Sequence, residues 1–413
     1  MSDEKETVVL AYSGGLDTSC ILVWLQEQGF NVIAYMADVG QEEDMEGAKA
    51  KAKKLGATKV FLEDLRQQFV EEFVFAAIKS NAAYEDRYLM GTAFARPCIA
   101  RRQVEIALQE NARYLSHGAT GKGNDQVRFE LTYYALYPEA KVIAPWRLPE
   151  FYNRFKGRTD LFEYAKAHDI PLPVTPKKPW SIDENMMHVS YEAGLLENPW
   201  EIAPDDLYKT TVDPKDAPNE PDVLDIEFKA GIPISVKNVN SGDVYSNPMQ
   251  LFLYLNTIGT RHGIGRIDIV ENRFIGMKSR GIYETRAATI LHVAHLDIEA
   301  ICLDKELRKI KQGLSIKLSE QVYHGLWWSP ECIFTRFCID KSQECVAGTV
   351  RVSVFKGQVY IKCRRGDMSL YNEELVSMDV SGSYDPQDAG GFIKINGLRL
   401  QEHARLRKTQ SKS

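Results

Sequence analysis

The chain has little of what marks a secreted, membrane-spanning or disulfide-stapled protein. Its seven cysteines are scattered over 413 residues without a Cys-x-x-Cys pair, which is typical of reduced thiols in a cytoplasmic protein. No uninterrupted apolar run approaches the ~18 residues of a membrane helix. The first residues, Met-Ser-Asp-Glu-Lys, are charged and do not lead into the pattern of a signal peptide. We therefore expect a soluble cytoplasmic protein.

An excess of positive charge is also missing. Lysine and arginine number 51 against 57 aspartate and glutamate residues, a formal net charge of −6, so no field over the whole molecule attracts nucleic acid or an anionic membrane. We expect neither as a partner, although a local basic surface is compatible with this balance. With 44% hydrophobic and 26% charged residues, the composition is that of a globular protein. The length predicts two or three domains, at roughly 100 to 200 residues per domain.

The first 170 residues predict a doubly wound α/β domain. Short apolar runs typical of buried strands alternate there with longer amphipathic runs typical of helices, and Gly29 and Gly56 stand where two of the helices end. This alternation indicates βαβ units with a parallel sheet covered on both faces. The predicted strands are 8–11, 32–35, 58–62 and 113–116, and the predicted helices are 18–28, 42–55, 65–79 and 96–110.

A proline-rich segment predicts the first domain boundary. Four prolines within ten residues exclude both a helix interior and a central strand; they are Pro171, Pro173, Pro176 and Pro179. We therefore divide the chain into an α/β domain at 1–170, an α+β domain at 171–396 and a C-terminal arm at 397–413. In the α+β domain we predict hairpins at 223–239 and 350–362, a strand at 267–271, and helices at 249–262 and 286–313.

The end of the first predicted strand carries a pair of glycines among polar residues. A helix is predicted to follow directly on the segment Ala11-Tyr12-Ser13-Gly14-Gly15-Leu16-Asp17-Thr18-Ser19. Paired glycines let the backbone turn sharply so that successive N–H groups converge on an anion, and the helix adds its unpaired N–H groups and positive dipole end. A helix cap would explain one polar residue but not the whole segment. It therefore predicts a phosphate-binding loop and a nucleotide-binding domain.

This loop differs from two common phosphate loops. Gly-x-x-x-x-Gly-Lys-Ser/Thr is absent, so it is not a Walker A loop, and it does not match the dinucleotide-binding fingerprint. Ser-Gly-Gly-x-Asp-Thr/Ser-Ser after a first strand instead resembles the pyrophosphatase loop of ATP-dependent ligases and tRNA-modifying enzymes, which cut ATP between its α- and β-phosphates.

A second glycine-rich segment follows the strand predicted at 113–116. It reads Ser116-His117-Gly118-Ala119-Thr120-Gly121-Lys122-Gly123-Asn124-Asp125 and continues to Arg128. Ligands of open α/β sheets collect at the carboxyl ends of the strands. Arg128 suits a carboxylate, because a guanidinium can form two parallel hydrogen bonds with it. The segment therefore predicts a polar ligand with carboxylate groups beside the phosphate.

Together with four further segments, this segment closely resembles the argininosuccinate synthetases of the animal type over essentially the whole chain. Those segments are Tyr88, the turn 91–93 before Ala95-Arg96-Pro97, the run 180–185 and the run 271–285. The family condenses citrulline with aspartate through a citrullyl-AMP intermediate, using ATP and releasing AMP and pyrophosphate. The resemblance implies a carbon–nitrogen ligase of arginine biosynthesis and the urea cycle, a synthetase and oligomerisation role for 171–396, and a homotetramer.

The resemblance also implies the ATP contacts by position. The phosphate loop would surround the pyrophosphate portion, Ala37 would border the adenosine, and the second segment would continue the site. Mg²⁺ is implied as the counterion of the phosphates, and no dedicated carboxylate cage for it is evident. The implied ATP-binding residues are Ala11, Tyr12, Ser13, Gly14, Gly15, Leu16, Asp17, Thr18, Ser19, Ala37, Ser116, His117, Gly118, Ala119, Thr120, Gly121, Lys122, Gly123 and Asn124.

Two further residue sets are implied for the amino-acid substrates. The citrulline contacts are Tyr88, Ala93, Asn124, Arg128, Ser181, Ser190, Glu271 and Tyr283, and the aspartate contacts are Thr120, Asn124 and Asp125. Arg128 would neutralise the citrulline carboxylate, and Glu271 would face its cationic amine. Ala93 stands where close animal relatives often have a serine. If that serine acts through its side chain, binding weakens here by ~0.5 to 1.5 kcal/mol, one ordinary hydrogen bond; if it acts through its backbone, nothing is lost.

Several features admit a second interpretation. Four basic residues stand against one acidic residue in 401–413, which is typical either of a solvated tail or of an arm that docks on another subunit. For His292 and His295, structural roles are favoured over metal binding. His117 either contacts phosphate or is a packed imidazole without a ligand. Trp327 and Trp328 are expected in the core or at a subunit interface.

Two other functions share the phosphate loop. A tRNA-thiolating or lysine-adding enzyme would carry a basic RNA-binding surface or catalytic cysteines, and the acidic balance and scattered cysteines argue against both. A catalytically silent nucleotide-binding relative would not need the intact polar residues Asp17, Asn124, Asp125 and Arg128. A measurement of turnover separates it from the ligase.

Overall fold

The computed structural model of the protein describes residues 5–171, 180–377 and 385–410. The chain forms two compact units, Met1–Met368 and Ser369–Ser413. Of the four prolines predicted to mark a boundary, Pro173, Pro176 and Pro179 lie outside the described residues. None of the helices that the structure describes is long and apolar enough to cross a membrane.

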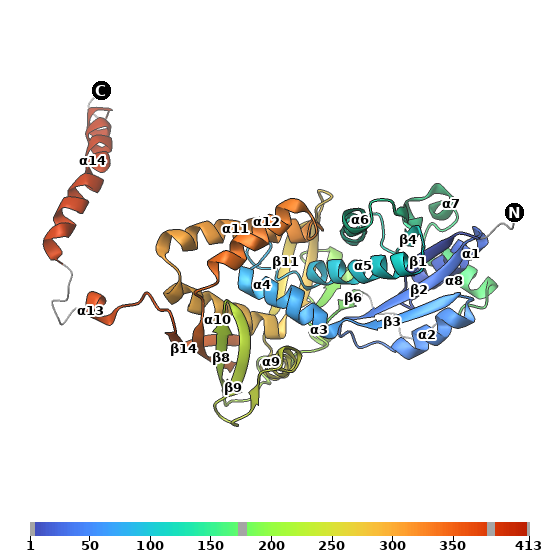
Figure 1. Cartoon of the computed structure of the whole chain (residues 1–413), viewed down its shortest axis with the longest axis horizontal. Helices are drawn as coiled ribbons and strands as arrows, with labels where there is room; N and C mark the ends of the chain where they lie inside the picture. The colour runs from blue at the N-terminus through green and yellow to red at the C-terminus, as the bar shows by residue number, and fades with distance from the viewer. Residues whose placement is uncertain (1–4, 172–179, 378–384, 411–413) are drawn as a thin grey trace. The chain divides into compact units, whose positions relative to one another are not determined.

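A five-stranded parallel sheet forms the N-terminal part of the larger unit (Figure 1). Its strands are β1 (Thr7–Ala11), β2 (Asn31–Asp38), β3 (Lys59–Asp64), β4 (Tyr114–Ser116) and β5 (Lys141–Ile143). Their order is β3-β2-β1-β4-β5. The chain therefore adds β2 and β3 on one side of β1 and then β4 and β5 on the other side. This confirms the predicted doubly wound fold. Folds of this kind bind ligands at the carboxyl ends of the strands where the order reverses, here between β1 and β4.

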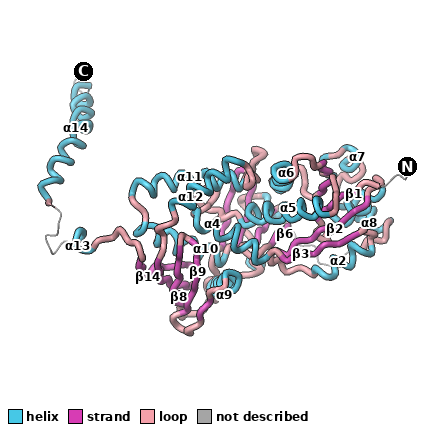
Figure 2. Tube along the Cα trace, in the orientation of Figure 1, coloured by secondary structure: helices cyan, strands magenta, loops and turns pink. Residues whose placement is uncertain are grey.

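Helices cover both faces of the sheet because its strands are apolar on both sides. Val8 and Leu10 pack with α1 (Leu16–Glu27), α2 (Met45–Lys54) and α8 (Arg158–Ala167). Val9 points the other way and packs with α5 (Gly91–Gln109) and α6 (Asp125–Leu136). Figure 2 shows α2 and α5 on opposite sides of the strands. Alternate residues of a strand face opposite sides of the sheet, so a strand that is buried on both faces is a continuous apolar run.

Some helix limits differ from the predictions. Gly29 and Gly56 follow α1 and α2 with φ of +90° and +88°, and both confirm the predicted helix ends. Helix α5 begins at Gly91, before the predicted start at 96, and contains Pro97. Proline favours the first turn of a helix, but burial of the preceding residues extends this one. The helix predicted at 65–79 consists of α3 (Arg66–Gln68), the π-helix η1 (Phe69–Val74) and α4 (Phe75–Ser80).

Two antiparallel sheets follow in the larger unit. The first has the order β10-β9-β8-β13-β14 and confirms both predicted hairpins, and the second has the order β11-β12-β7-β6. The strands of the first sheet are β8 (Asp222–Lys229), β9 (Ile232–Asn238), β10 (Val244–Tyr245), β13 (Gly348–Phe355) and β14 (Gln358–Gly366). Those of the second are β6 (Ser181–Glu184), β7 (Val189–Glu192), β11 (Arg266–Asn272) and β12 (Lys278–Glu284).

The long helix predicted at 286–313 is two helices. The longer helices of this part are α9 (Pro248–His262), α10 (Arg286–Cys302), α11 (Lys305–Tyr323) and α12 (Pro330–Ser342). Asp304 separates α10 from α11, and its Oδ1 accepts hydrogen bonds from the N–H groups of Glu306 and Leu307 at 2.9 and 3.2 Å. This is the N-cap that starts a new helix. The remaining short helices of the larger unit are η2 (Pro145–Arg147), α7 (Pro149–Tyr152), η3 (Gly194–Glu197) and η4 (Asp205–Leu207).

One apolar cluster joins η1, α4 and α5 to α9, α10 and the sheet around β8. It fixes the N-terminal part of the larger unit against the C-terminal part, so side chains from both can meet at one place. The smaller unit contains α13 (Glu373–Val376) and α14 (Pro386–Gln410), whose described side chains are not buried. Exposed apolar residues of α14 are Phe392, Ile393, Ile395, Leu398, Leu400 and Leu406.

Candidate active site

The phosphate loop lies between the end of β1 and the start of α1. Gly14 has a φ of +77°, and Gly15 precedes α1 without a capping side chain, so the first N–H groups of the helix are available to an anion. The Ser13 hydroxyl lies 3.0 Å from the Thr18 hydroxyl, and the Ser13 N–H donates to the same Thr18 oxygen at 3.3 Å. These bonds hold the loop against the start of the helix.

Gly118 brings the second glycine-rich segment into contact with the phosphate loop. Strand β4 pairs with β1, with Ser116 opposite Leu10, so both segments leave the same edge of the sheet. A Cβ atom at Gly118 would lie 2.8 Å from Cγ2 of Thr18, so a larger residue would force the two segments apart. They therefore form one continuous rim where the strand order reverses.

Lys51 reaches the phosphate loop from α2. Its Nζ donates to the Gly14 carbonyl oxygen at 3.0 Å, and a Cβ atom at Gly14 would lie 2.6 Å from Cβ of Ala48. Partial burial lowers the pKa of Lys51, and it forms no ion pair with a carboxylate in the described part of the chain. The sequence did not indicate this lysine, because it lies outside the loop motif.

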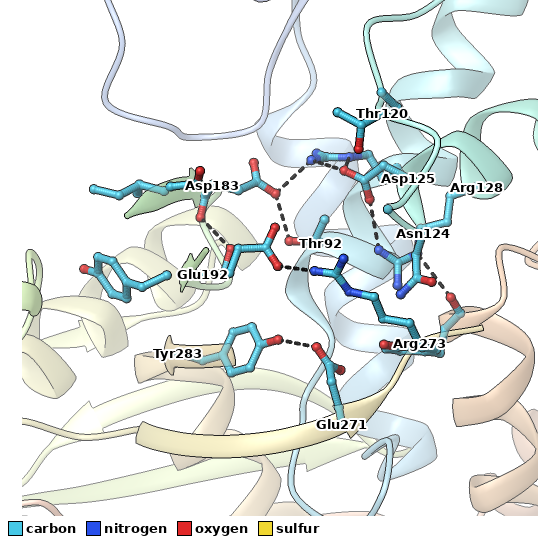
Figure 3. A pocket seen from close by; sticks show the side chains of 18 of the residues that line it. Thr92, Thr120, Asn124, Asp125, Arg128, Asp183, Glu192, Glu271, Arg273 and Tyr283 are labelled. Carbon is cyan, nitrogen blue, oxygen red and sulfur yellow. Dashed lines mark hydrogen bonds and ion pairs between the residues drawn. The ribbon is translucent and has the colours of Figure 1, made fainter. Parts of the chain in front are cut away.

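A cavity of about 330 Å³ opens beside the second segment (Figure 3). Its walls come from the start of α5, the second segment, α6, the strands of the second antiparallel sheet and the end of α11. Both parts of the larger unit therefore contribute to it. The lining residues are Tyr88, Thr92, Arg96, Gly118, Ala119, Thr120, Gly123, Asn124, Asp125, Arg128, Ser181, Ile182, Asp183, Ser190, Tyr191, Glu192, Glu271, Arg273, Tyr283 and Tyr323.

Arg96 holds two carboxylates on one wall of the cavity. Its Nη2 lies 2.8 Å from Oδ2 of Asp125 and 2.8 Å from Oδ2 of Asp183, and Thr92 donates to the same Asp183 oxygen at 2.9 Å. Arg128 Nη1 lies 3.0 Å from the other oxygen of Asp125. Desolvation favours the neutral acid, but the two arginines hold the pKa of Asp125 below its usual range. Asp125 is thus an anion fixed between two cations.

Glu271 presents a buried carboxylate on the opposite wall (Figure 3). The Tyr283 hydroxyl donates to its Oε1 at 2.6 Å. Its Oε2 is buried beside the Tyr323 hydroxyl, but neither atom makes a hydrogen bond of normal geometry within the described structure. Burial raises the pKa of Glu271. A buried carboxylate oxygen with an unused acceptor position suits a cationic amine.

Aromatic rings form a neutral wall between these charged groups. Tyr88 stacks on Tyr283 with 4.2 Å between ring centroids, and the His188 ring lies parallel to Tyr88. His188 Nε2 lies 2.8 Å from the Thr92 hydroxyl. Burial lowers the pKa of His188 to about 3, so this imidazole is neutral at neutral pH and adds no charge to the cavity.

The cavity brings together most residues assigned to the two amino-acid substrates. All three aspartate residues and seven of the eight citrulline residues line it; Ala93 is fully buried and does not. Of the ATP residues, five line the cavity: Gly118, Ala119, Thr120, Gly123 and Asn124. The loop 11–19 adjoins it through Gly118, and Ala37 lies near the carboxyl end of β2.

Seven polar lining residues were not assigned from the sequence: Thr92, Arg96, Asp183, Tyr191, Glu192, Arg273 and Tyr323. The first three and Arg273 lie within the segments that carry the family resemblance, so their position in those segments was an available signal. Tyr191, Glu192 and Tyr323 lie outside every motif. Only their place in the lining of the cavity reveals them.

Three of the remaining candidates, His117, His295 and Trp327, pack inside the protein, and His292 and Trp328 are partly buried. His117 uses both ring nitrogens there: Nε2 lies 3.0 Å from Oε1 of Glu130, and Nδ1 accepts from the Ala119 N–H at 3.2 Å. It does not line the cavity. His295 contacts the side chains of Asn81 and Gln343, and Trp327 is a core residue with 2% exposure.

A phosphate loop at the switch point of a parallel sheet, beside a cavity with paired charges of both signs, defines a nucleotide-binding enzyme with small zwitterionic substrates. The family model described as arginosuccinate synthase N-terminal HUP domain matches residues 7–171, and that of the arginosuccinate synthase C-terminal domain matches residues 180–403. The chain belongs to the argininosuccinate synthase family.

Individual relatives agree with the family models. The argininosuccinate synthase of Rattus norvegicus is 69% identical over 402 residues, which are 97% of this chain and 98% of that protein. That of Xenopus laevis is 66% identical over 410 residues, 99% of this chain and 100% of that protein. That of Homo sapiens is 68% identical over 402 residues, which are 97% of this chain and 98% of that protein. The similarity therefore spans nearly the full length of each relative.

Proposed function

We propose that the chain joins citrulline to aspartate and converts ATP to AMP and pyrophosphate. As a member of the argininosuccinate synthase family it is an ATP-using carbon–nitrogen ligase. The ureido carbon of citrulline is stabilised by resonance, and its oxygen is a poor leaving group. Adenylylation makes that oxygen part of AMP, which the α-amine of aspartate can then displace. Both steps need alignment and charge stabilisation more than a protein nucleophile.

The rim formed by the two glycine-rich segments is the ATP site in this proposal. The loop 11–19 surrounds the pyrophosphate portion, and the first N–H groups of α1 point at it. Ala37 borders the adenosine, and the segment 116–124 continues the site toward the cavity. Lys51 adds a positive charge beside Gly14, where a Walker A loop would carry a lysine of its own.

Mg²⁺ enters this proposal as the counterion of the ATP phosphates and thus as part of the substrate. Across residues 5–171, 180–377 and 385–410, no three or more His, Cys, Asp or Glu side chains form a group that could hold a metal ion. Asp17 is the acidic residue of the phosphate loop, and burial raises its pKa. The charge of the phosphates is therefore balanced by backbone N–H groups, Lys51 and the accompanying cation.

Citrulline fits the cavity through its two opposite charges. Arg128 pairs with its carboxylate, and the Oε2 atom of Glu271, which has no other partner of normal geometry, accepts from its amine. Tyr88 and Tyr283 enclose its aliphatic chain. The remaining polar contacts are Asn124, Ser181 and Ser190, all of which line the cavity.

Aspartate binds at the end of the cavity nearest the second segment. Thr120 and Asn124 provide donors for its carboxylates. Asp125 is held as an anion by Arg96 and Arg128, so it repels carboxylates and attracts the α-ammonium group. This orientation points the aspartate nitrogen into the cavity, toward the ureido group of citrulline.

One observation carries the proposal: a single cavity is lined by all three aspartate residues, seven citrulline residues and part of the ATP segment. The test is mass spectrometry of the products from purified protein. Argininosuccinate should form only when ATP, citrulline and aspartate are all present. ATP binding without any product in the complete mixture would instead favour a catalytically silent relative.

The proposal also includes an assembly and a location. We propose a homotetramer in the cytoplasm, with the arm at 397–413 docked on a neighbouring subunit, and we keep the domain limits 1–170 and 171–396. The exposed apolar residues of α14, which begins at Pro386, support such an arm, because apolar side chains of a surface helix are stabilised when a second subunit covers them.

A further inference from the structure

The second half-reaction needs a proton acceptor. Aspartate enters with an α-ammonium group, whose nitrogen has no free electron pair, so one N–H bond must break and its proton must move to a base. The nitrogen then bonds to the ureido carbon while the bond from that carbon to the AMP oxygen breaks, and AMP leaves with the electron pair. When the adenylylated group is a neutral isourea, the two hydrogens left from the ammonium group of aspartate stay in the guanidinium product. A single base is therefore sufficient.

Four carboxylates line the cavity: Asp125, Asp183, Glu192 and Glu271. Asp125 lies between Arg96 and Arg128, and Asp183 accepts hydrogen bonds from Arg96 and Thr92. Protonation of either would weaken charge-assisted hydrogen bonds, so both are poor bases. Glu271 already accepts from Tyr283, and the proposed function gives its second oxygen to the amine of citrulline.

Glu192 is the one of the four that accepts a single hydrogen bond within the described structure and has no substrate contact in the proposed function. It is the last residue of β7, and Figure 3 shows its carboxylate between Asp183 and the pair formed by Tyr283 and Glu271. Arg273 Nη2 donates to its Oε2 at 2.6 Å, while Oε1 makes no hydrogen bond with the described residues. The side chain is 48% exposed, and Glu192 lines the cavity.

The surroundings of Glu192 suit a base. Desolvation raises its pKa against the opposing charge of Arg273, and the negative charges of Asp125 and Asp183 raise it further. Asp125, in contrast, is kept ionised by its two arginines. Two neighbouring carboxylates whose pKa values are pushed apart are typical of a division of roles, in which one binds and the other transfers a proton.

We propose that Glu192 is the catalytic base of the second half-reaction: its Oε1 takes a proton from the α-ammonium of aspartate while Asp125 holds that group in place. The inference rests on the proposed function. Arg273 positions the Glu192 carboxylate through Oε2, which leaves Oε1 directed to the substrate.

A two-step rapid-quench experiment on the full-length enzyme tests this role. The enzyme is mixed with ATP, Mg²⁺ and citrulline, and aspartate is added afterwards. Wild-type protein should release pyrophosphate before the addition and form argininosuccinate after it. Glu192→Gln should retain the pyrophosphate burst within about threefold and slow the second step by roughly 10² to 10⁴. Glu192→Asp, which keeps the carboxylate, should restore part of the rate.

A pH profile adds a readout that a merely structural role would not change. Without a protein base, the second step depends on the free amine of aspartate. Its rate in Glu192→Gln should therefore rise about tenfold per pH unit between about pH 7 and 9, a dependence that the wild type lacks. The matched control is Glu197→Gln, an exposed glutamate of η3 outside the cavity lining, which should leave both steps unchanged.

The possible failures are distinguishable. The role of Glu192 is overturned if Glu192→Gln forms argininosuccinate at the wild-type rate, or if it loses both steps to the same extent. If the wild type itself gives no citrulline-dependent pyrophosphate, the proposed function fails and the inference fails with it.

Discussion

The amino group of Lys51 lies 3.0 Å from the carbonyl oxygen of Gly14, a residue 37 positions earlier in the chain. A Walker A loop carries its lysine within the motif, whereas here α2 brings one to the loop through tertiary packing. The carbonyl dipole holds the ammonium at the rim without neutralising it. The phosphate loop therefore gains a positive charge that its own sequence lacks.

Replacement of this lysine should weaken phosphate binding selectively. Lys51→Met keeps most of the apolar stem and removes the charge. A hydrogen bond to a charged group is worth ~1.5 to 3 kcal/mol, so the KM for ATP and the inhibition constant of pyrophosphate should rise roughly 10- to 100-fold. The KM for citrulline should stay within about twofold. Lys53→Met, an exposed lysine of the same helix, is the control. Equal changes in both KM values would mean that Lys51 supports only the fold.

Arg128 should control citrulline binding. It pairs with Asp125 and donates from Nε to the Tyr323 carbonyl oxygen at 3.1 Å, so Arg128→Leu removes a fixed cation from the cavity. The KM for citrulline should rise at least about tenfold, and the KM for ATP much less, because loss of one charge-assisted bond costs ~1.5 to 3 kcal/mol. Steady-state kinetics with each substrate varied in turn measures both. Equal effects would show that the residue is assigned to the wrong substrate.

Deletion of the predicted arm should change the assembly. Removal of 397–413 shortens α14 and takes away the exposed Leu398, Leu400 and Leu406. If another subunit covers these side chains, light scattering should find the truncated protein as smaller species than the full-length chain. The substitution Arg405→Gln, which keeps the apolar residues, is a matched control. A truncated protein with the mass of a tetramer would refute the docking role.

Asp222 should make stability depend on pH at the acidic end. It is buried, but bonds from Asn238, Arg261 and His262 lower its pKa. Because the folded-state pKa lies below the unfolded value of about 3.9, its contribution to stability is complete above about pH 5 and is lost as the pH falls through the folded-state value. Asp222→Asn should therefore cost roughly 1 to 3 kcal/mol at neutral pH.

Denaturant unfolding at several pH values checks this prediction. The difference in the free energy of unfolding between wild type and Asp222→Asn should be constant between about pH 7 and 5 and shrink below about pH 4. Asp206→Asn, at an exposed position of η4, should show no difference at any of these values. A gap that grows on acidification would contradict the assigned direction.

The parallel sheet could be predicted because its signal is local. Each of its first strands is a short apolar run followed by an amphipathic helix. Because such a strand is buried on both faces, the apolar run alone predicts it, and no alternation is needed to show which side faces the core. The sheet β11-β12-β7-β6 could not be predicted to the same extent. Strand β7 has four residues and pairs Tyr191 with Ile282, about ninety positions away, so nothing near it in the sequence indicates a partner.

The residues of the site also differ in whether the sequence or only the tertiary packing reveals them. Gly14, Gly118 and Arg128 stand in motifs whose spacing is itself informative, and the sequence alone indicated them. Glu192 and Lys51 became visible only through packing: β7 carries one into the cavity, and α2 carries the other to the phosphate loop. A lone glutamate at the end of a short strand has no sequence signal that separates it from a solvated surface residue.

The most direct test of the account is pyrophosphate release from purified protein with ATP and Mg²⁺, measured with and without citrulline and with and without aspartate. We predict release that requires citrulline but not aspartate in the first turnover, followed by argininosuccinate only when aspartate is added. No release in any mixture, despite measurable ATP binding, would contradict the account and leave a catalytically silent member of the family.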